Sequence, residues 1–192
     1  MNISIMFRLL KKRKRSIIYV GKYKGKKAIL KEDSGLGNVK KEGKWLKLLN
    51  KHKIGPKLLA IRKNSIICEF VKGVPLIDLV KKRKIKKIHL LEILRQCRIM
   101  DKLKINKKEF TRPYQHVLIG KEVKIIDFER CYKSKKVRNV TQFCQFLMQN
   151  KKRLRLKFDD KEFRELLKNY KNKPSEGNFK RVVSFVFIRK HH

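Results

Sequence analysis

The spacing of apolar residues changes near residue 72, and this change limits the folds that the chain can adopt. Before it, short runs rich in β-branched and aromatic residues predict strands at 3–9, 16–22, 27–31, 57–61 and 65–70. After Gly73 and Pro75, apolar residues at 90, 91, 94, 97 and 100 share one face of a helix over 89–104. The pattern predicts an α+β chain, with a small antiparallel-sheet segment at 1–71 and a mainly helical segment at 72–192.

Local signals place several boundaries. Gly25 supplies the positive φ that a hairpin turn at 23–26 requires. Asn38 is a suitable N-cap for a helix that ends before Ile54-Gly55-Pro56. In the second segment we expect a tight hairpin over 117–126, helices near 139–150 and 159–170, and a short apolar end at 182–188.

The chain is very basic, with 55 Lys and Arg against 16 Asp and Glu in 192 residues and a net charge of +39. Its hydrophobic content of 41% is too high for a disordered chain. The longest uncharged apolar stretch, 182–188, is far shorter than the ~20 residues of a membrane span, so we expect a soluble protein. Alanine occurs only at positions 28 and 60, which is typical of an AT-rich genome, so codon bias contributes to the charge.

The four cysteines lie at positions 68, 97, 131 and 144, without the spacing of a metal site. Their neighbours are mostly apolar, which indicates buried free thiols and a reducing, cytoplasmic location. Basic clusters at 11–15, 81–87, 133–138 and 151–157 fit the electrostatic footprint of a nucleic-acid binder. They contain few aromatic residues, so backbone contacts with structured RNA or a ribonucleoprotein are favoured over base stacking. A merely solvated basic face is the alternative.

Several short motifs occur in a characteristic order. Ala28-Ile29-Leu30-Lys31 ends a strand, and Glu42 lies on the helix that follows. Cys68 to Gly73 reads Cys-Glu-Phe-Val-Lys-Gly, and Ile126-Asp127-Phe128-Glu129 follows the second hairpin. Over residues 3–150 this order resembles the protein kinase-like two-lobed fold, with a small antiparallel-sheet N-lobe and a reduced helical C-lobe. The compact size and Ile54-Gly55-Pro56 are similar to small archaeal kinases of the RIO type and the type associated with tRNA threonylcarbamoylation.

The resemblance implies a site for ATP and Mg²⁺. Lys31 would hold the phosphates and Glu42 would orient Lys31, because phosphoryl transfer relies on positioning and charge neutralisation. Asp127, directly after an apolar strand, would bind Mg²⁺. The backbone from Glu69 to Val71 would take the adenine.

The segment at 107–116 departs from the family's catalytic loop. Counting back from the hairpin puts His116 at the position of the metal-binding asparagine and Thr111 at that of the catalytic aspartate. Allowing two extra residues makes Glu109 the base, and a carboxylate is able to accept a hydroxyl proton near neutral pH. We therefore expect Glu109 and Asp127 as catalytic residues, with His116 assisting at the metal or a phosphate.

In the family, a glycine-rich turn between the first two strands brings its backbone close to the phosphates. The corresponding residues here, 10–16, contain no glycine. Either cationic side chains replace the backbone N–H groups there, or the ligand is a different and larger one. Glu129 replaces the glycine that normally follows Asp-Phe.

These observations predict an atypical ATP- and Mg²⁺-dependent kinase that acts on a Ser/Thr hydroxyl of a protein. The alternative is a catalytically inactive kinase-like module that binds RNA or a ribonucleoprotein through its basic surface. A small ribosomal or chromatin protein fits the composition but not the order of the motifs.

Overall fold

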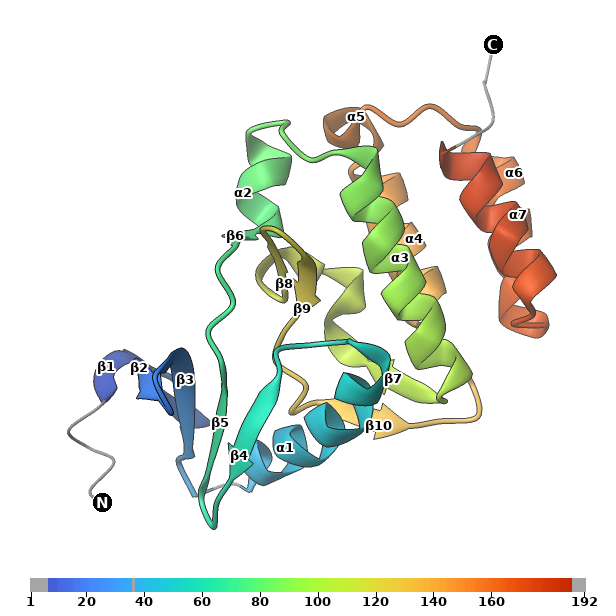
Figure 1. The fold of residues 1–192 in the computed structure, drawn as a ribbon. Coiled ribbons are helices and arrows are strands. Elements are labelled where there is room, and N and C mark those ends of the chain that lie inside the picture. The colour runs from blue at the N-terminus through green and yellow to red at the C-terminus, as the bar shows by residue number, and fades with distance from the viewer. Residues whose placement is uncertain (1–6, 36, 188–192) are drawn as a thin grey trace. The chain divides into compact units, whose positions relative to one another are not determined.

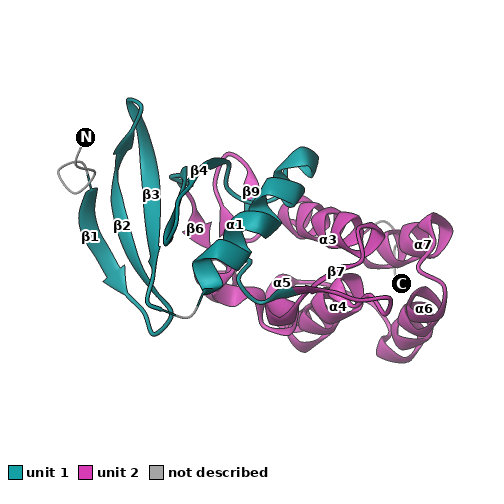
Figure 2. Cartoon of the chain, turned by 90° about the horizontal axis from the view of Figure 1, so that it is seen from below, with its two compact units in different colours: residues 1–72, 124–131 teal, residues 73–123, 132–192 magenta. Residues whose placement is uncertain are grey.

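The computed structural model describes residues 7–35 and 37–187, and its fold is α+β (Figure 1). The chain forms two compact units (Figure 2). The first comprises the chain up to Lys72 together with Lys124–Cys131, and the second comprises Gly73–Val123 and the chain from Tyr132 onward. Residues 124–131, which the sequence pattern assigns to the C-terminal segment, thus belong to the first unit.

The first unit contains an antiparallel five-stranded sheet in the order β1-β2-β3-β5-β4. Its strands are β1 (Phe7–Lys12), β2 (Ser16–Tyr23), β3 (Lys26–Asp33), β4 (Leu58–Ile61) and β5 (Ser65–Glu69). The expected strand at 3–9 lies outside the described residues at 3–6. The observed β1 continues through the basic residues to Lys12, because every position from Arg8 on is exposed and tolerates charge.

Helix α1 (Asn38–Leu49) crosses one face of this sheet, and a short 3₁₀ turn, Asn50–His52, follows it. The prediction that Asn38 is the N-cap was wrong. The N-cap is Gly37, with φ +66°, and the Asp33 carboxylate accepts hydrogen bonds from Gly35 N, Gly37 N and Val39 N at 2.9–3.1 Å. A carboxylate at the end of β3 therefore satisfies the free N–H groups at the start of the helix.

The second unit is mainly helical. Its helices are α2 (Leu76–Lys81), α3 (Lys87–Lys102), α4 (Asn139–Gln149), α5 (Lys151–Leu154), α6 (Asp160–Asn172) and α7 (Glu176–Phe187). Helices α3 and α4 pack together, as do α6 and α7 (Figure 1). The predicted helices near 89–104, 139–150 and 159–170 are confirmed, whereas the apolar end at 182–188 is largely part of α7. None of the helices formed by the described residues is long and apolar enough to cross a membrane.

Short strands and turns complete the chain after Lys72, and the last two of these strands each contain residues of both units. The strands are β6 (Val74–Pro75), β7 (Ile105–Lys107), β8 (Val117–Ile119), β9 (Val123–Ile125) and β10 (Cys131–Lys133), with 3₁₀ turns at Lys108–Thr111 and Pro113–Gln115. Strands β8 and β9 form the hairpin that the sequence predicts. All four cysteines are buried and free, as expected.

A buried polar network fixes the loop that follows α3. The Asp101 carboxylate, 3% exposed, accepts hydrogen bonds from Asn139 N at 3.0 Å, Asn139 Nδ2 at 2.7 Å and Tyr170 Oη at 2.9 Å. Asn139 in turn donates to the Ile105 carbonyl at 2.6 Å and accepts from Lys107 N at 2.9 Å. One buried carboxylate thereby joins α3, α4, α6 and β7.

Candidate functional site

Three charged side chains of the first unit meet in a partly buried cluster. Lys31 Nζ lies 3.0 and 2.9 Å from the two carboxylate oxygens of Glu42, and 2.5 Å from Oδ1 of Asp127. The side chains of Lys31, Glu42 and Asp127 are 15%, 3% and 14% exposed. The structure thus brings together three of the residues predicted from the sequence, over separations of 11 and 96 positions.

The alternation of β3 explains where Lys31 points. Ala28 and Leu30 are buried on one face of the sheet, so Lys31 lies on the other face, and Ile66 is its partner in β5. Helix α1 covers that second face closely. A Cβ at Gly43 would lie only 2.9 Å from Cγ2 of Ile66. The missing side chain at Gly43 therefore lets the helix approach the sheet and brings the adjacent Glu42 to Lys31.

Asp127 is held in place by its neighbour Phe128. Its own backbone has φ +62°, a left-handed conformation that aspartate adopts more readily than most residues. The Phe128 ring is fully buried, and the Phe128 N–H donates to Oε1 of Glu42 at 3.3 Å. Glu42 therefore binds both the ammonium of Lys31 and the backbone next to Asp127.

The electrostatics favour a charged lysine. Burial by itself lowers the pKa of Lys31, but the negative charges of Glu42 and Asp127 outweigh burial and raise the pKa above its ordinary value of 10.5. The cluster thus keeps a permanent cation beside two carboxylates.

The turn between β1 and β2 contributes two arginines to the same region. Arg13 Nη1 lies 3.2 Å from Oδ2 of Asp127, and Arg15 Nη1 lies 3.3 Å from Oε1 of Glu129. The absence of glycine from this turn leaves open either a cationic replacement or a different and larger ligand, and the pairing of the two arginines with Asp127 and Glu129 is not predicted by the sequence.

Glu69 and Val71, the expected adenine segment, lie at and just beyond the end of β5. Glu69 N donates to the Lys57 carbonyl at 2.9 Å, and its carboxylate accepts from Lys57 N at 2.8 Å. Phe70 N donates to the Lys27 carbonyl at 3.1 Å. Two N–H groups of this segment are therefore bonded within the first unit, and Val71 follows them partly buried.

Glu109 and His116 belong to the second unit. The Glu109 carboxylate accepts a hydrogen bond at 2.9 Å from Nζ of Lys107, which is fully buried. Because the Lys107 backbone is bonded to Asn139, the polar network around Asp101 also determines the position of Glu109. His116 follows the second 3₁₀ turn and is partly buried.

No group of three or more His, Cys, Asp or Glu side chains suited to a metal ion occurs among residues 7–35 and 37–187. Mg²⁺ does not need such a cage, since proteins usually bind it through one or two carboxylates together with substrate phosphates. The Asp127 carboxylate is 14% exposed, with Lys31 at Oδ1 and Arg13 at Oδ2.

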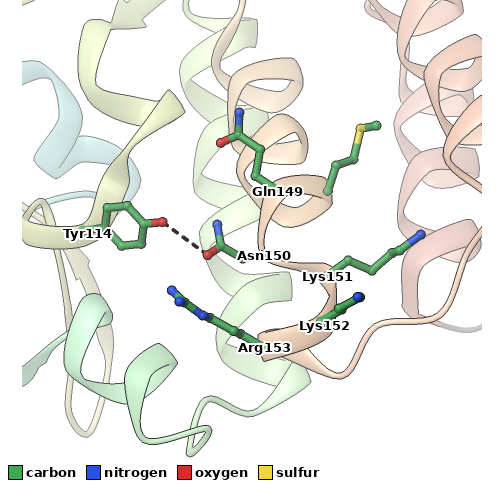
Figure 3. Close-up of a pocket in the computed structure, with 7 residues that line it drawn as sticks. Tyr114, Gln149, Asn150, Lys151, Lys152 and Arg153 are labelled. Carbon is green, nitrogen blue, oxygen red and sulfur yellow. Dashed lines mark hydrogen bonds between the residues drawn. The ribbon is translucent and has the colours of Figure 1, made fainter.

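A second feature, in the second unit, is a pocket of about 550 Å³ (Figure 3). It is lined by Tyr114, Met148, Gln149, Asn150, Lys151, Lys152 and Arg153. Tyr114 Oη donates to Oδ1 of Asn150 at 3.2 Å. The Lys151 ammonium already binds Asp160 at 2.8 Å, whereas Lys152 and Arg153 are exposed. The basic run at 151–157 is evident in the sequence, but that its first residues line one pocket with Tyr114 depends on tertiary structure.

The chain matches no model of a known protein family, and a search of curated proteins finds no match.

Proposed function

We propose that the protein is an ATP- and Mg²⁺-dependent phosphotransferase with a protein kinase-like fold, acting on a Ser/Thr hydroxyl of a protein. One observation carries the proposal. Lys31 is held between Glu42 and Asp127 in a cluster that also binds the Phe128 backbone. A solvated surface lysine has no need of a 3% exposed carboxylate, whereas a lysine that must present one orientation to a phosphate does.

Each residue of the candidate site has a proposed role. The Lys31 ammonium binds phosphate oxygens, and Glu42 keeps it in position through both carboxylate oxygens. Asp127 holds Mg²⁺, which neutralises phosphate charge when bound. The backbone from Glu69 to Val71 binds the adenine.

Glu109 is the proposed base, because a carboxylate can accept the proton of an attacking hydroxyl. The buried Lys107 ammonium orients its carboxylate. His116, in the same loop, assists at the metal or a phosphate.

Calorimetric titration with MgATP tests the proposal. High salt is needed, because a protein of charge +39 attracts polyanions and salt screens that attraction. We expect binding that persists at high salt, is lost in Lys31→Met and Asp127→Asn, and is kept in Lys26→Met, which removes an exposed lysine from the same strand. Absence of binding in the wild type, or equal binding in all four proteins, would refute the nucleotide site.

Phosphate transfer is measured separately with radiolabelled ATP and serine- and threonine-rich test proteins. Glu109→Gln is expected to bind MgATP normally and to lose transfer by about 100-fold or more. An unchanged rate of phosphate transfer in this variant would show that Glu109 is not the base.

The pocket beside Tyr114 favours a second candidate function, an inactive kinase-like module that binds RNA or a ribonucleoprotein. The pocket combines an aromatic ring with exposed cations at Lys152 and Arg153. Fluorescence anisotropy with a labelled RNA hairpin tests this candidate. We expect the double variant Lys152→Gln/Arg153→Gln to bind more weakly than Lys82→Gln/Arg83→Gln, which removes the same charge from another basic cluster. Equal affinities would mean that the pocket has no special part in RNA binding.

A further inference from the structure

The Asp127 carboxylate binds two cations from different parts of the first unit. Lys31 contacts Oδ1 and Arg13 contacts Oδ2, so both oxygens have a cationic partner. Arg15, two residues after Arg13, pairs with Glu129, two residues after Asp127. The β1–β2 turn and the segment after β9 thus form two parallel ion pairs.

The two cationic partners of Asp127 differ in their exposure to solvent. Lys31 is 15% exposed and is also bound by the buried Glu42, so that contact is shielded from solvent. Arg13 and Arg15 are both 44% exposed. Exposed ion pairs contribute little to stability. A ligand that needs Asp127 would therefore displace Arg13 before Lys31.

The backbone of the turn is anchored independently of these ion pairs. Arg13 N donates to the Ser16 carbonyl at 2.9 Å, and Ser34 Oγ donates to the Lys14 carbonyl at 3.0 Å. An exchange of partners by the two arginines therefore requires side-chain rotation and no rearrangement of the sheet.

We propose that Arg13 and Arg15 form a polyphosphate clamp that exchanges partners. This inference rests on the proposed function. In the ligand-free protein the two guanidinium groups neutralise Asp127 and Glu129. When Mg²⁺ and a polyphosphate bind, Arg13 gives up Asp127 to the metal, and both arginines bind phosphate oxygens, which the planar guanidinium does well. They replace the backbone N–H groups of a glycine-rich turn.

The exchange predicts opposite effects on two ligands. In Arg13→Gln, Mg²⁺ alone should bind about two- to fivefold more tightly, because the Asp127 carboxylate no longer has to be released from its exposed ion pair with Arg13. Tripolyphosphate alone should bind about tenfold more weakly, because a charge-assisted hydrogen bond is lost. The wild type should bind each ligand more tightly when the other is present, and this reciprocal coupling should decrease in the variant.

The experiment is calorimetric titration of Mg²⁺, of tripolyphosphate and of both together at constant ionic strength. The proteins are the wild type, Arg13→Gln, Arg15→Gln and Arg8→Gln, the last removing an exposed arginine from β1. We expect Arg15→Gln to weaken tripolyphosphate binding as Arg13→Gln does, and Arg8→Gln to behave as the wild type.

Two results would overturn the clamp. One is tripolyphosphate binding to Arg13→Gln that equals binding to Arg8→Gln, and the other is Mg²⁺ binding that Arg13→Gln weakens. Either result leaves the proposed function intact if MgATP binding still depends on Lys31 and Asp127. Failure of the wild type to bind MgATP would instead refute the proposed function. The comparison of tripolyphosphate binding among the variants would still show whether Arg13 and Arg15 bind phosphate.

Discussion

Gly55→Ala should destabilise the first unit through packing against the segment that carries Asp127. Gly55 has φ +80°, and a Cβ there would lie 2.8 Å from Cδ2 of Leu46 and 2.8 Å from Cε2 of Phe128. Leu46 and Phe128 are both fully buried, so neither can move into solvent. The β2–β3 turn offers a matched control, because Gly25 has φ +76° and no atom within 4 Å of the added Cβ.

The two substitutions share a backbone cost and differ in packing. An alanine in the left-handed region costs about 1–2 kcal/mol, and overpacking in a closed core costs about 1–3 kcal/mol more. We therefore expect Gly55→Ala to lower the free energy of unfolding by about 2–5 kcal/mol, and Gly25→Ala by only about 1–2 kcal/mol.

Urea unfolding monitored by circular dichroism measures the difference. Because Phe128 N binds Glu42, displacement of the Phe128 ring should also weaken MgATP binding in Gly55→Ala and leave it unchanged in Gly25→Ala. Equal losses of stability in the two variants would show that the packing of Gly55 against Phe128 does not contribute to the free energy of unfolding, and would refute the reasoning.

Three further predictions concern buried groups. Because folding raises the pKa of Lys31, its stabilising charge is fully present below pH 10.5 and is lost as the pH rises beyond it. The difference in unfolding free energy between wild type and Lys31→Met should therefore shrink above pH 10.5, as measured by urea titration. Asp101→Ala should cost about 3–5 kcal/mol, because it leaves several buried donors unpaired. Tyr170→Phe removes two hydrogen bonds, the one that Tyr170 Oη donates to Asp101 and the one that it accepts from Arg98, and should cost about 2 kcal/mol; equal costs in the two variants would contradict the central place of Asp101 in this network. The four buried cysteines should resist a thiol reagent at pH 8 until the protein unfolds. Burial raises the pKa of Cys68 to about 12 and that of Cys97 well above its ordinary value, so few of these thiols are ionised at pH 8. Rapid labelling of the native protein would contradict this prediction.

Some elements of the fold depend only on local sequence signals. The hairpin at Gly25 and the helix near 89–104 follow from backbone conformation and periodicity, and both are confirmed. Helix α7 was missed, although its buried residues Phe179, Val182 and Val186 have helical spacing. The cap at Asn38 was wrong because Asp33, five residues earlier, binds the start of α1 instead.

The sequence by itself determined the α+β character of the chain, the strand that carries Lys31 and the helix that carries Glu42, because these depend on neighbouring residues. Only the tertiary structure decided that Lys31 contacts Asp127 across 96 positions, and that Arg13 does so across 114. Such contacts depend on how sheet, helix and loop pack, here on Gly43 against Ile66 and on Phe128 in the core. Periodicity records which face of an element is buried, but not which distant residue covers it.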